Sequence, residues 1–181
     1  MDRVRKWNRG QHDGQDAFAP LDLDQQLEKA MARKVWLPSG GYLIIDHTEA
    51  MTVIDVNTGS FVGSGGNLEA TVTENNLEAA EEIVRQLRLR DIGGMIVVDF
   101  IDMLLQQNQD LVLRRLSEFL GRDRTRHKLG EVTSLGLVQL TRKRLGTGLL
   151  ETFSTPCEAC EGRGFICLLY TSPSPRDLST S

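Results

Sequence analysis

The sequence predicts an α/β protein, and two observations support that prediction. Short apolar runs, typical of strands, alternate with longer segments in which apolar residues recur every three or four positions, typical of helices. Taken in order, residues 42–121 give two strands, a loop, a helix, a strand and a helix. Such an order describes a sheet layer covered by helices.

The first 34 residues lead into this pattern. Residues 1–20 show no sustained apolar period and are expected to be a loop or a frayed edge. Residues 21–34 are expected to be helical, because Leu23, Leu27 and Met31 recur at helical spacing. The Pro-Ser-Gly-Gly run at 38–41 then breaks the chain.

A hairpin and a helix follow. The apolar runs 42–45 and 51–56, separated by a polar turn, predict two paired strands, and residues 59–67 form a glycine-rich loop. The next segment predicts an amphipathic helix that Asn75 or Asn76 caps. Its apolar face contains Leu77, Ala80, Ile83, Val84 and Leu87.

The remaining elements are a strand, a helix and a segment of open assignment. Residues 95–99 are almost wholly apolar and are expected to be a strand that is buried on both faces. Residues 103–121 predict a helix, and 122–128 form a basic run. Residues 135–140 fit a strand or a helix equally well.

Composition excludes several classes of protein. The 181 residues are 40% hydrophobic and 25% charged, as in a soluble globular protein. The sequence shows no apolar run that could span a bilayer and no secretion signal at its start, so we expect a cytoplasmic protein. The net charge of -4 hides an asymmetry, because residues 11–84 carry -10 and residues 111–146 carry +6. The basic part could hold phosphates, or it could be an ordinary solvated surface.

Two aspartates are the strongest candidates for chemistry. Asp55 and Asp99 each follow an apolar run that predicts a buried strand. At the carboxyl end of neighbouring strands they could share one magnesium ion, which prefers carboxylate oxygens. Asn57 lies two residues after Asp55, on the same side of an extended chain, and could orient a phosphate or a metal-bound water. Alternatively, both aspartates form turns or pair with Arg88 or Arg90.

Other polar residues have more ordinary interpretations. Asp102 is expected to cap the helix that follows it. His12, His47 and His127 are isolated in the sequence and are expected to be surface groups rather than metal ligands. In the basic run, Arg122, Arg124, Arg126 and Lys128 alternate, so in an extended segment they would point one way and could bind phosphates.

A pair of cysteines predicts a metal site. Cys157 and Cys160 have the spacing of two zinc ligands, and Gly162 and Gly164 let the backbone turn around a metal. Structural zinc needs four ligands, so the simplest completion is the same pair from a second subunit. A partner pair in missing sequence and a redox-active pair are the alternatives.

The last residues do not fit the rest of the chain. Residues 167–181 resemble a translated sequencing adapter, and we exclude this tail, with Cys167, from the functional reasoning. The expected organisation is an N-terminal segment (1–34), a catalytic subdomain (35–150), a zinc link (151–166) and the tail.

Several blocks of the sequence resemble the ribonuclease E/G family. They cover roughly residues 22–166, in the order found in the family, and include residues 35–42, 48–59, 76–80, 85–91, 93–103 and 157–164. Many members have a proline directly after the first cysteine; here Glu158 stands there and Pro156 precedes the cysteine. The family's S1 domain, a segment resembling ribonuclease H and most of its 5′ sensor would precede residue 1, so the resemblance implies a fragment.

The resemblance implies a fold and an activity. The fold would be a mixed sheet with flanking helices, resembling deoxyribonuclease I, followed by the zinc link. The activity would be magnesium-dependent endonucleolytic cleavage of single-stranded RNA, with Asp55 and Asp99 as magnesium ligands and Asn57 at the scissile phosphate or the attacking water. Arg126 matches an arginine that helps to bind the RNA 5′-monophosphate, and Arg124 and Lys128 lie beside it. Cys157 and Cys160 match a zinc link shared by two protomers, which implies a dimer, or a tetramer at full length. A non-catalytic, zinc-organised RNA-binding module and a DNA phosphodiesterase are the rival functions.

Overall fold

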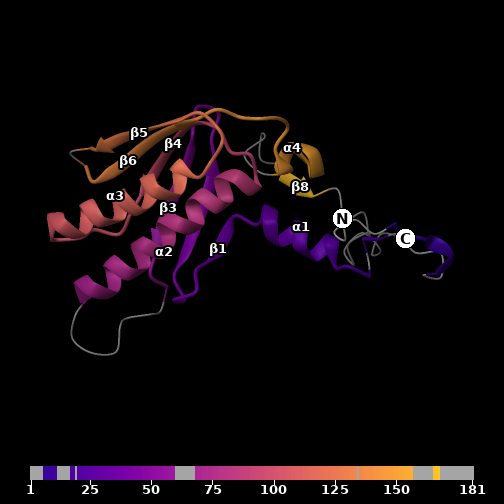
Figure 1. The fold of residues 1–181 in the computed structure, drawn as a ribbon, viewed down its shortest axis with the longest axis horizontal. Coiled ribbons are helices and arrows are strands. Elements are labelled where there is room, and N and C mark those ends of the chain that lie inside the picture. The colour runs from indigo at the N-terminus through magenta and orange to yellow at the C-terminus, as the bar shows by residue number, and fades with distance from the viewer. Residues whose placement is uncertain are drawn as a thin grey trace, which may run out of the picture.

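A six-stranded sheet forms the centre of the protein, and two long helices pack on one of its faces (Figure 1). The structure is a computed structural model that describes residues 6–11, 17–18, 20–59, 68–133, 135–156 and 165–167. The strands lie in the order β1-β2-β3-β4-β6-β5. They are β1 (Lys34–Trp36), β2 (Tyr42–His47), β3 (Thr52–Asn57), β4 (Gly94–Asp99), β5 (His127–Val132) and β6 (Leu137–Arg142).

The sheet is mixed, as predicted. Strands β3 and β4 are parallel, and every other neighbouring pair in the sheet is antiparallel. The predicted hairpin is confirmed in β2 and β3, which pair from Tyr42–Asn57 to His47–Thr52. Helix α2 (Leu68–Leu89) belongs to the connection between the two parallel strands, and α3 (Gln106–Gly121) packs beside it. The α/β class and the flanking helices are therefore confirmed.

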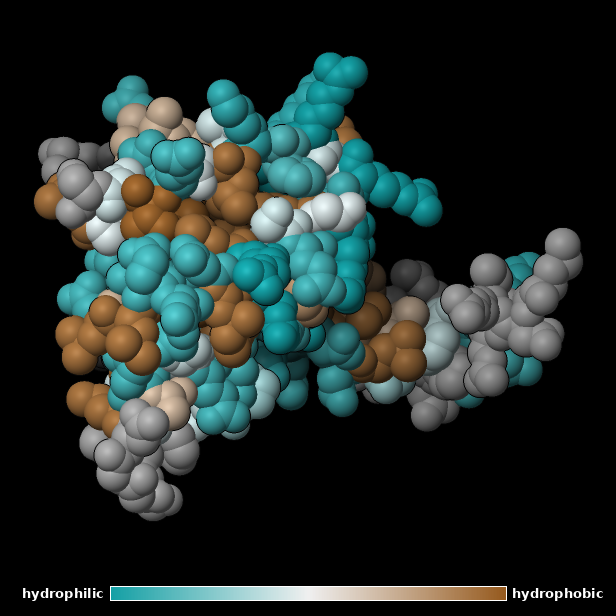
Figure 2. All heavy atoms as spheres, turned by 60° about the vertical axis from the view of Figure 1, so that its left-hand side comes forward, coloured by the Kyte–Doolittle hydropathy of each residue, from teal (hydrophilic) through white to brown (hydrophobic). Residues whose placement is uncertain are grey.

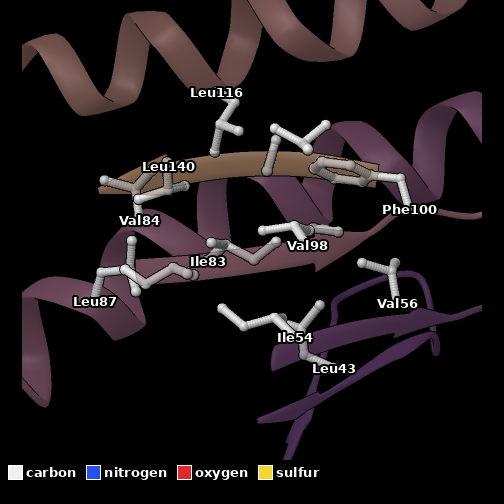
Figure 3. Close-up of a cluster of buried hydrophobic side chains, with 14 of the residues drawn as sticks. Leu43, Ile54, Val56, Ile83, Val84, Leu87, Val98, Phe100, Leu116 and Leu140 are labelled. Atoms are coloured by element: carbon white, nitrogen blue, oxygen red, sulfur yellow. The ribbon is translucent and has the colours of Figure 1, made fainter. Parts of the chain in front are cut away.

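Buried and exposed side chains alternate along the strands, so the sheet has one buried face and one open face. On β3, Ile54 and Val56 are buried under the helices, while Asp55 points the other way and is exposed. Strand β4 behaves alike: Ile96 and Val98 are buried, but Met95 is 47% exposed. The prediction that this strand is buried on both faces is therefore wrong, because the helices pack on one face only. Figure 3 shows the core, formed by residues such as Leu43, Ile54, Val98 and Leu140 from the strands and Ile83, Leu87 and Leu116 from the helices.

Two helix boundaries differ from the prediction. Helix α2 begins at Leu68, so Asn75 and Asn76 lie inside it rather than at its cap. Helix α3 begins only at Gln106. Local pattern suggested otherwise because asparagine usually caps helices, whereas here both asparagines are buried and bonded to other segments. Helix α1 (Leu23–Met31) falls within the predicted range.

Within the six-stranded sheet, strands β1 and β5 were not predicted, and the open assignment of residues 135–140 is resolved. Residues 137–142 are strand β6. The short edge strand β1 lies partly in the segment expected to be helical. Strand β5 begins at His127, so Lys128 is the only member of the basic run that lies in a strand. The basic run is therefore not one extended row.

Smaller elements complete the description. They are η1 (Arg9–Gln11), α4 (Leu149–Phe153), β7 (Ser154–Pro156) and β8 (Phe165–Cys167). Strands β7 and β8 are antiparallel, with Pro156 opposite Phe165. Among the described residues, no helix has the length and apolar character needed to cross a bilayer.

Candidate active site

Asp55 and Asp99 lie side by side on the open face of the sheet. They are direct partners in the register of the parallel strands β3 and β4, and both are exposed. Neighbouring strands are about 4.8 Å apart, and partners in register point to the same face. Forty-four positions of sequence thus separate two carboxylates that the sheet brings together. Each stands near the carboxyl end of its strand, where α/β proteins commonly bind ligands.

Asn57 is connected to this pair. It lies two residues after Asp55 on β3, so both side chains are on the same face. Its Nδ2 donates a 2.8 Å hydrogen bond to Oδ2 of Asp55. The bond orients that carboxylate through one of its two oxygens.

The electrostatics of the pair suit a cation. Burial raises the pKa of Asp99, and the nearby charges of Asp55 and Asp102 raise it further. A divalent cation would relieve the repulsion between these carboxylates. The described residues contain no group of three or more His, Cys, Asp or Glu placed to hold a metal. Two carboxylates are a donor set that magnesium commonly uses, and it completes its shell with water and phosphate oxygens.

Asp102 does not cap helix α3, contrary to the prediction. The helix begins four residues later, at Gln106, and Glu69 of α2 binds the backbone of the two residues just before it. The Glu69 carboxylate accepts hydrogen bonds from the backbone N–H groups of Leu104 and Leu105, both 3.1 Å, and from Asn108 Nδ2 at 2.8 Å. Asp102 is left exposed, close enough to Asp99 to raise the pKa of that residue.

Asn76 holds the segment that follows Asp99, a role that sequence reasoning missed. Its side chain is fully buried. Nδ2 donates to the Ile101 carbonyl at 2.8 Å, and Oδ1 accepts from the Ile101 N–H at 3.1 Å. The signal in the sequence was the presence of two consecutive asparagines inside an amphipathic helix.

The predicted basic group lies at the other end of the sheet. Asp99 pairs with Leu137 at the start of β6, whereas His127 pairs with Arg142 at its end. Five residue steps, about 17 Å, separate the two levels. Arg124, Arg126 and Lys128 are exposed there, so the structure does not bring them to the aspartates.

Not every basic residue in this region is available to a ligand. Arg122 forms an ion pair with Glu118, and its guanidinium lies over the ring of Phe119, 4.7 Å from the ring centre. The side chain of Arg142 is only 2% exposed and bonds to Asp91 and Asp123.

The two described histidines each bond to a neighbouring residue. His47 bonds to Thr52, and His127 to the Thr125 carbonyl. His12, Cys157 and Cys160 lie outside the described residues. Strands β7 and β8 pair Pro156 with Phe165. The residues on either side of segment 157–164, which contains both cysteines, therefore lie opposite one another.

Two recesses lie near the helices. A groove of about 1040 Å³ runs along α2, with walls that carry Glu78, Glu82, Arg85 and Arg88, and it contains neither aspartate of the pair. A small cavity of about 40 Å³ lies beside the site and is lined by Asp102, among others. Figure 2 shows the end of the molecule at which α2 and α3 begin, where apolar patches lie among hydrophilic ones. Exposed leucines at this end include Leu68, Leu104, Leu105 and Leu135.

Comparison with known proteins decides the family. The model of the "Ribonuclease E/G family" matches residues 2–145. The chain belongs to the ribonuclease E/G family. Among its relatives, ribonuclease G of Escherichia coli K12 is 45% identical over 157 residues, which cover 87% of this chain and 32% of that protein. Ribonuclease E of Synechocystis is 47% identical over 88% of the chain and 24% of its own length. Ribonuclease E of Nostoc is 51% identical over 78% and 20%.

The family resemblance seen in the sequence is thus confirmed. The chain spans about a third or less of the length of these ribonuclease E/G relatives. The acid pair and Asn57 all lie within the matched residues, whereas Cys157 and Cys160 lie beyond the match of the family model.

Proposed function

We propose that this chain carries the cleavage site of a magnesium-dependent endoribonuclease that hydrolyses phosphodiester bonds of single-stranded RNA. The observation that supports it most strongly is the register of β3 and β4, which sets Asp55 beside Asp99 on an open face. Relatives named ribonuclease G and ribonuclease E supply the substrate class.

Each residue of the site would have a separate role in binding the metal or in positioning its ligands. Asp55 and Asp99 would hold one magnesium ion, which supplies a Lewis acid for the phosphoryl group and lowers the pKa of a bound water. Asn57 would keep the Asp55 carboxylate in place through its hydrogen bond. Asn76 and Glu69 would fix the segment after Asp99, because they bind the backbone at Ile101, Leu104 and Leu105.

The basic group would bind RNA at a distance from the cut. Arg124, Arg126 and Lys128 are exposed at the opposite end of the sheet. Contacts from these side chains to phosphates would position the strand without taking part in the chemistry, so binding should weaken as salt rises. Arg126 is the proposed contact for a 5′-monophosphate.

Zinc would link two copies of the chain. The thiolates of Cys157 and Cys160 would supply two ligands, and a second subunit would supply the same pair. In support, Pro156 and Phe165, which flank the segment with both cysteines, are paired across β7 and β8.

The test is cleavage of a labelled single-stranded RNA by the chain and by Asp55→Asn and Asp99→Asn variants. We expect each variant to lose cleavage while it keeps the circular dichroism spectrum and RNA affinity of the unsubstituted chain. Asp46→Asn, on the neighbouring strand β2, is the matched control and should still cleave. Cleavage retained by either site variant would overturn the assignment.

The same assay separates the rivals. A zinc-organised binding module would retain RNA and one zinc per two chains but cut nothing at any magnesium concentration. A DNA phosphodiesterase would cut single-stranded DNA in preference to RNA of the same sequence.

A further inference from the structure

We propose that Trp36, with Tyr42 and Lys34, forms a nucleobase-binding subsite on the open face of the sheet. It would receive a base of the RNA strand whose phosphate is held at Asp55 and Asp99. The inference rests on the proposed function and adds to it a second contact, specific for the base rather than for the phosphate.

The register of the strands places these residues on one face. Trp36 pairs with Tyr42, and Tyr42 pairs with Asn57. In the next row Lys34 pairs with Ile44, which pairs with Asp55. Side chains directly opposite one another on antiparallel strands point to the same face. Trp36 is therefore about 12 Å from Asp55, across two strand spacings and two residue steps, and Tyr42 lies between them.

Trp36 presents a large aromatic surface that the core does not use. The residue is 63% exposed on the edge strand β1. The ring of Tyr42 packs edge-on against it, with 5.5 Å between ring centres and 64° between planes. Tyr42 is half-buried and so holds the indole in place.

A cation completes the cluster. The Lys34 ammonium lies 4.0 Å from the centre of the Trp36 ring and 3.7 Å from that of Tyr42. A ligand for this cluster should combine a flat π surface, for stacking, with a negative charge, for the ammonium. A nucleotide of single-stranded RNA has both, and proteins that bind such strands commonly combine aromatic platforms with basic groups.

Charge decides between the two surfaces that Trp36 borders. The groove along α2 also includes Trp36, but its walls carry Glu78, Glu81 and Glu82 together with arginines. The three glutamates balance the three arginines Arg85, Arg88 and Arg122, so the groove offers phosphates no net positive charge. On the open face the Lys34 ammonium lies over both rings, so a base with its phosphate is expected on that side.

The test uses the fluorescence of Trp36 with the full chain, in a Trp7→Phe background that leaves one tryptophan of the two. Single-stranded RNA and a fully abasic oligonucleotide of equal length are titrated in EDTA, so that no cleavage occurs. RNA should quench Trp36, and the abasic strand should not. Because base stacking on an aromatic side chain contributes substantially, Trp36→Ala should bind RNA roughly 5- to 150-fold more weakly.

Two further variants keep the result interpretable. Trp36→Phe retains a stacking surface and should restore most of the affinity. Leu145→Ala removes a side chain that is 75% exposed near the opposite end of the sheet and should bind as the unsubstituted chain does.

The outcomes separate the subsite from the proposed function. Quenching and weaker binding by Trp36→Ala, without cleavage by the unsubstituted chain in magnesium, would support the subsite and overturn the nuclease. Normal cleavage with equal RNA affinity in Trp36→Ala would overturn the subsite and leave the nuclease standing. Absence of RNA binding by the unsubstituted chain would overturn both.

Discussion

Arg142 links three segments of the chain at one end of the sheet. Its Nε donates to Asp123 at 2.8 Å, and its Nη1 donates to Asp91 at 3.1 Å and to the Ile92 carbonyl at 2.9 Å. These bonds connect the end of β6 to the turn before β4 and to the exit of α3. One of the charges in the basic part of the sequence (residues 111–146) thus has a structural role.

Because Asp123 bonds to Arg142, the stability of this end of the sheet depends on pH. Burial alone would raise the pKa of Asp123, but hydrogen bonds from Thr125 and Arg142 lower it to about 2. Because the pKa is lower in the folded state, the contribution is complete above the unfolded value of about 4 and is lost as pH falls toward 2. In urea unfolding at pH 7, Asp123→Asn should cost on the order of 2 kcal/mol, and the difference should shrink between pH 4 and pH 2. A difference that stays constant over this range would contradict the assignment.

Asn76 can be tested separately from the acid pair. Asn76→Ala leaves the Ile101 N–H and carbonyl without their partner, so the free energy of unfolding should fall by about 1–3 kcal/mol. Cleavage should fall as well, because the segment after Asp99 loses its attachment to α2. Glu74→Ala, an exposed position on the same helix, should change neither quantity. Full activity in Asn76→Ala would show that this segment does not need the attachment.

Among the helices and strands, those that depend on residues adjacent in sequence were predicted, and those that depend on distant contacts were not. The hairpin of β2 and β3 follows from two apolar runs and a polar turn, and the pairing of Asp55 with Asp99 was anticipated because both residues follow such runs. The start of α2 was missed because Asn75 and Asn76 are bonded to segments distant in sequence. The cluster of Trp36, Tyr42 and Lys34 could not be predicted, since strand β1 is three residues long and its neighbours follow from the register.

Gly41, in the turn between β1 and β2, tests how closely this turn packs against Asn57 and Asn75. A Cβ on Gly41 would lie 2.7 Å from the Asn57 carbonyl oxygen and would collide with the Asn75 side chain. Gly41→Ala should therefore lower the melting temperature and weaken cleavage by displacing Asn57. Gly121→Ala is the control, because a Cβ there meets nothing within 4 Å. Equal melting temperatures for the two variants would contradict the close packing at Gly41.

At the scale of the whole molecule, charge is divided between the two ends of the sheet. The carboxylates stand at one end, and Arg124, Arg126 and Lys128 stand at the other. An RNA strand that contacts both would run along the sheet for about 17 Å or more. Replacement of all three basic residues by glutamine should reduce RNA affinity and flatten its dependence on salt concentration. Cleavage at saturating RNA should change little, and a large loss there would place these residues in the chemistry.

The zinc proposal also belongs to the whole molecule. A chelator, or Cys157→Ser, should convert a dimer to monomers in native mass spectrometry, and zinc analysis of the untreated chain should give one ion per two subunits. One zinc per chain, or a dimer that survives chelation, would contradict a zinc shared between subunits.

The proposed cleavage site requires that Asp55 and Asp99 bind one magnesium ion together. Calorimetric titration of magnesium into the chain, without RNA, measures this directly. We expect one site per chain that is lost or strongly weakened in both Asp55→Asn and Asp99→Asn and kept in Asp46→Asn. If magnesium binds equally well to the unsubstituted chain and to either site variant, the two carboxylates do not share an ion.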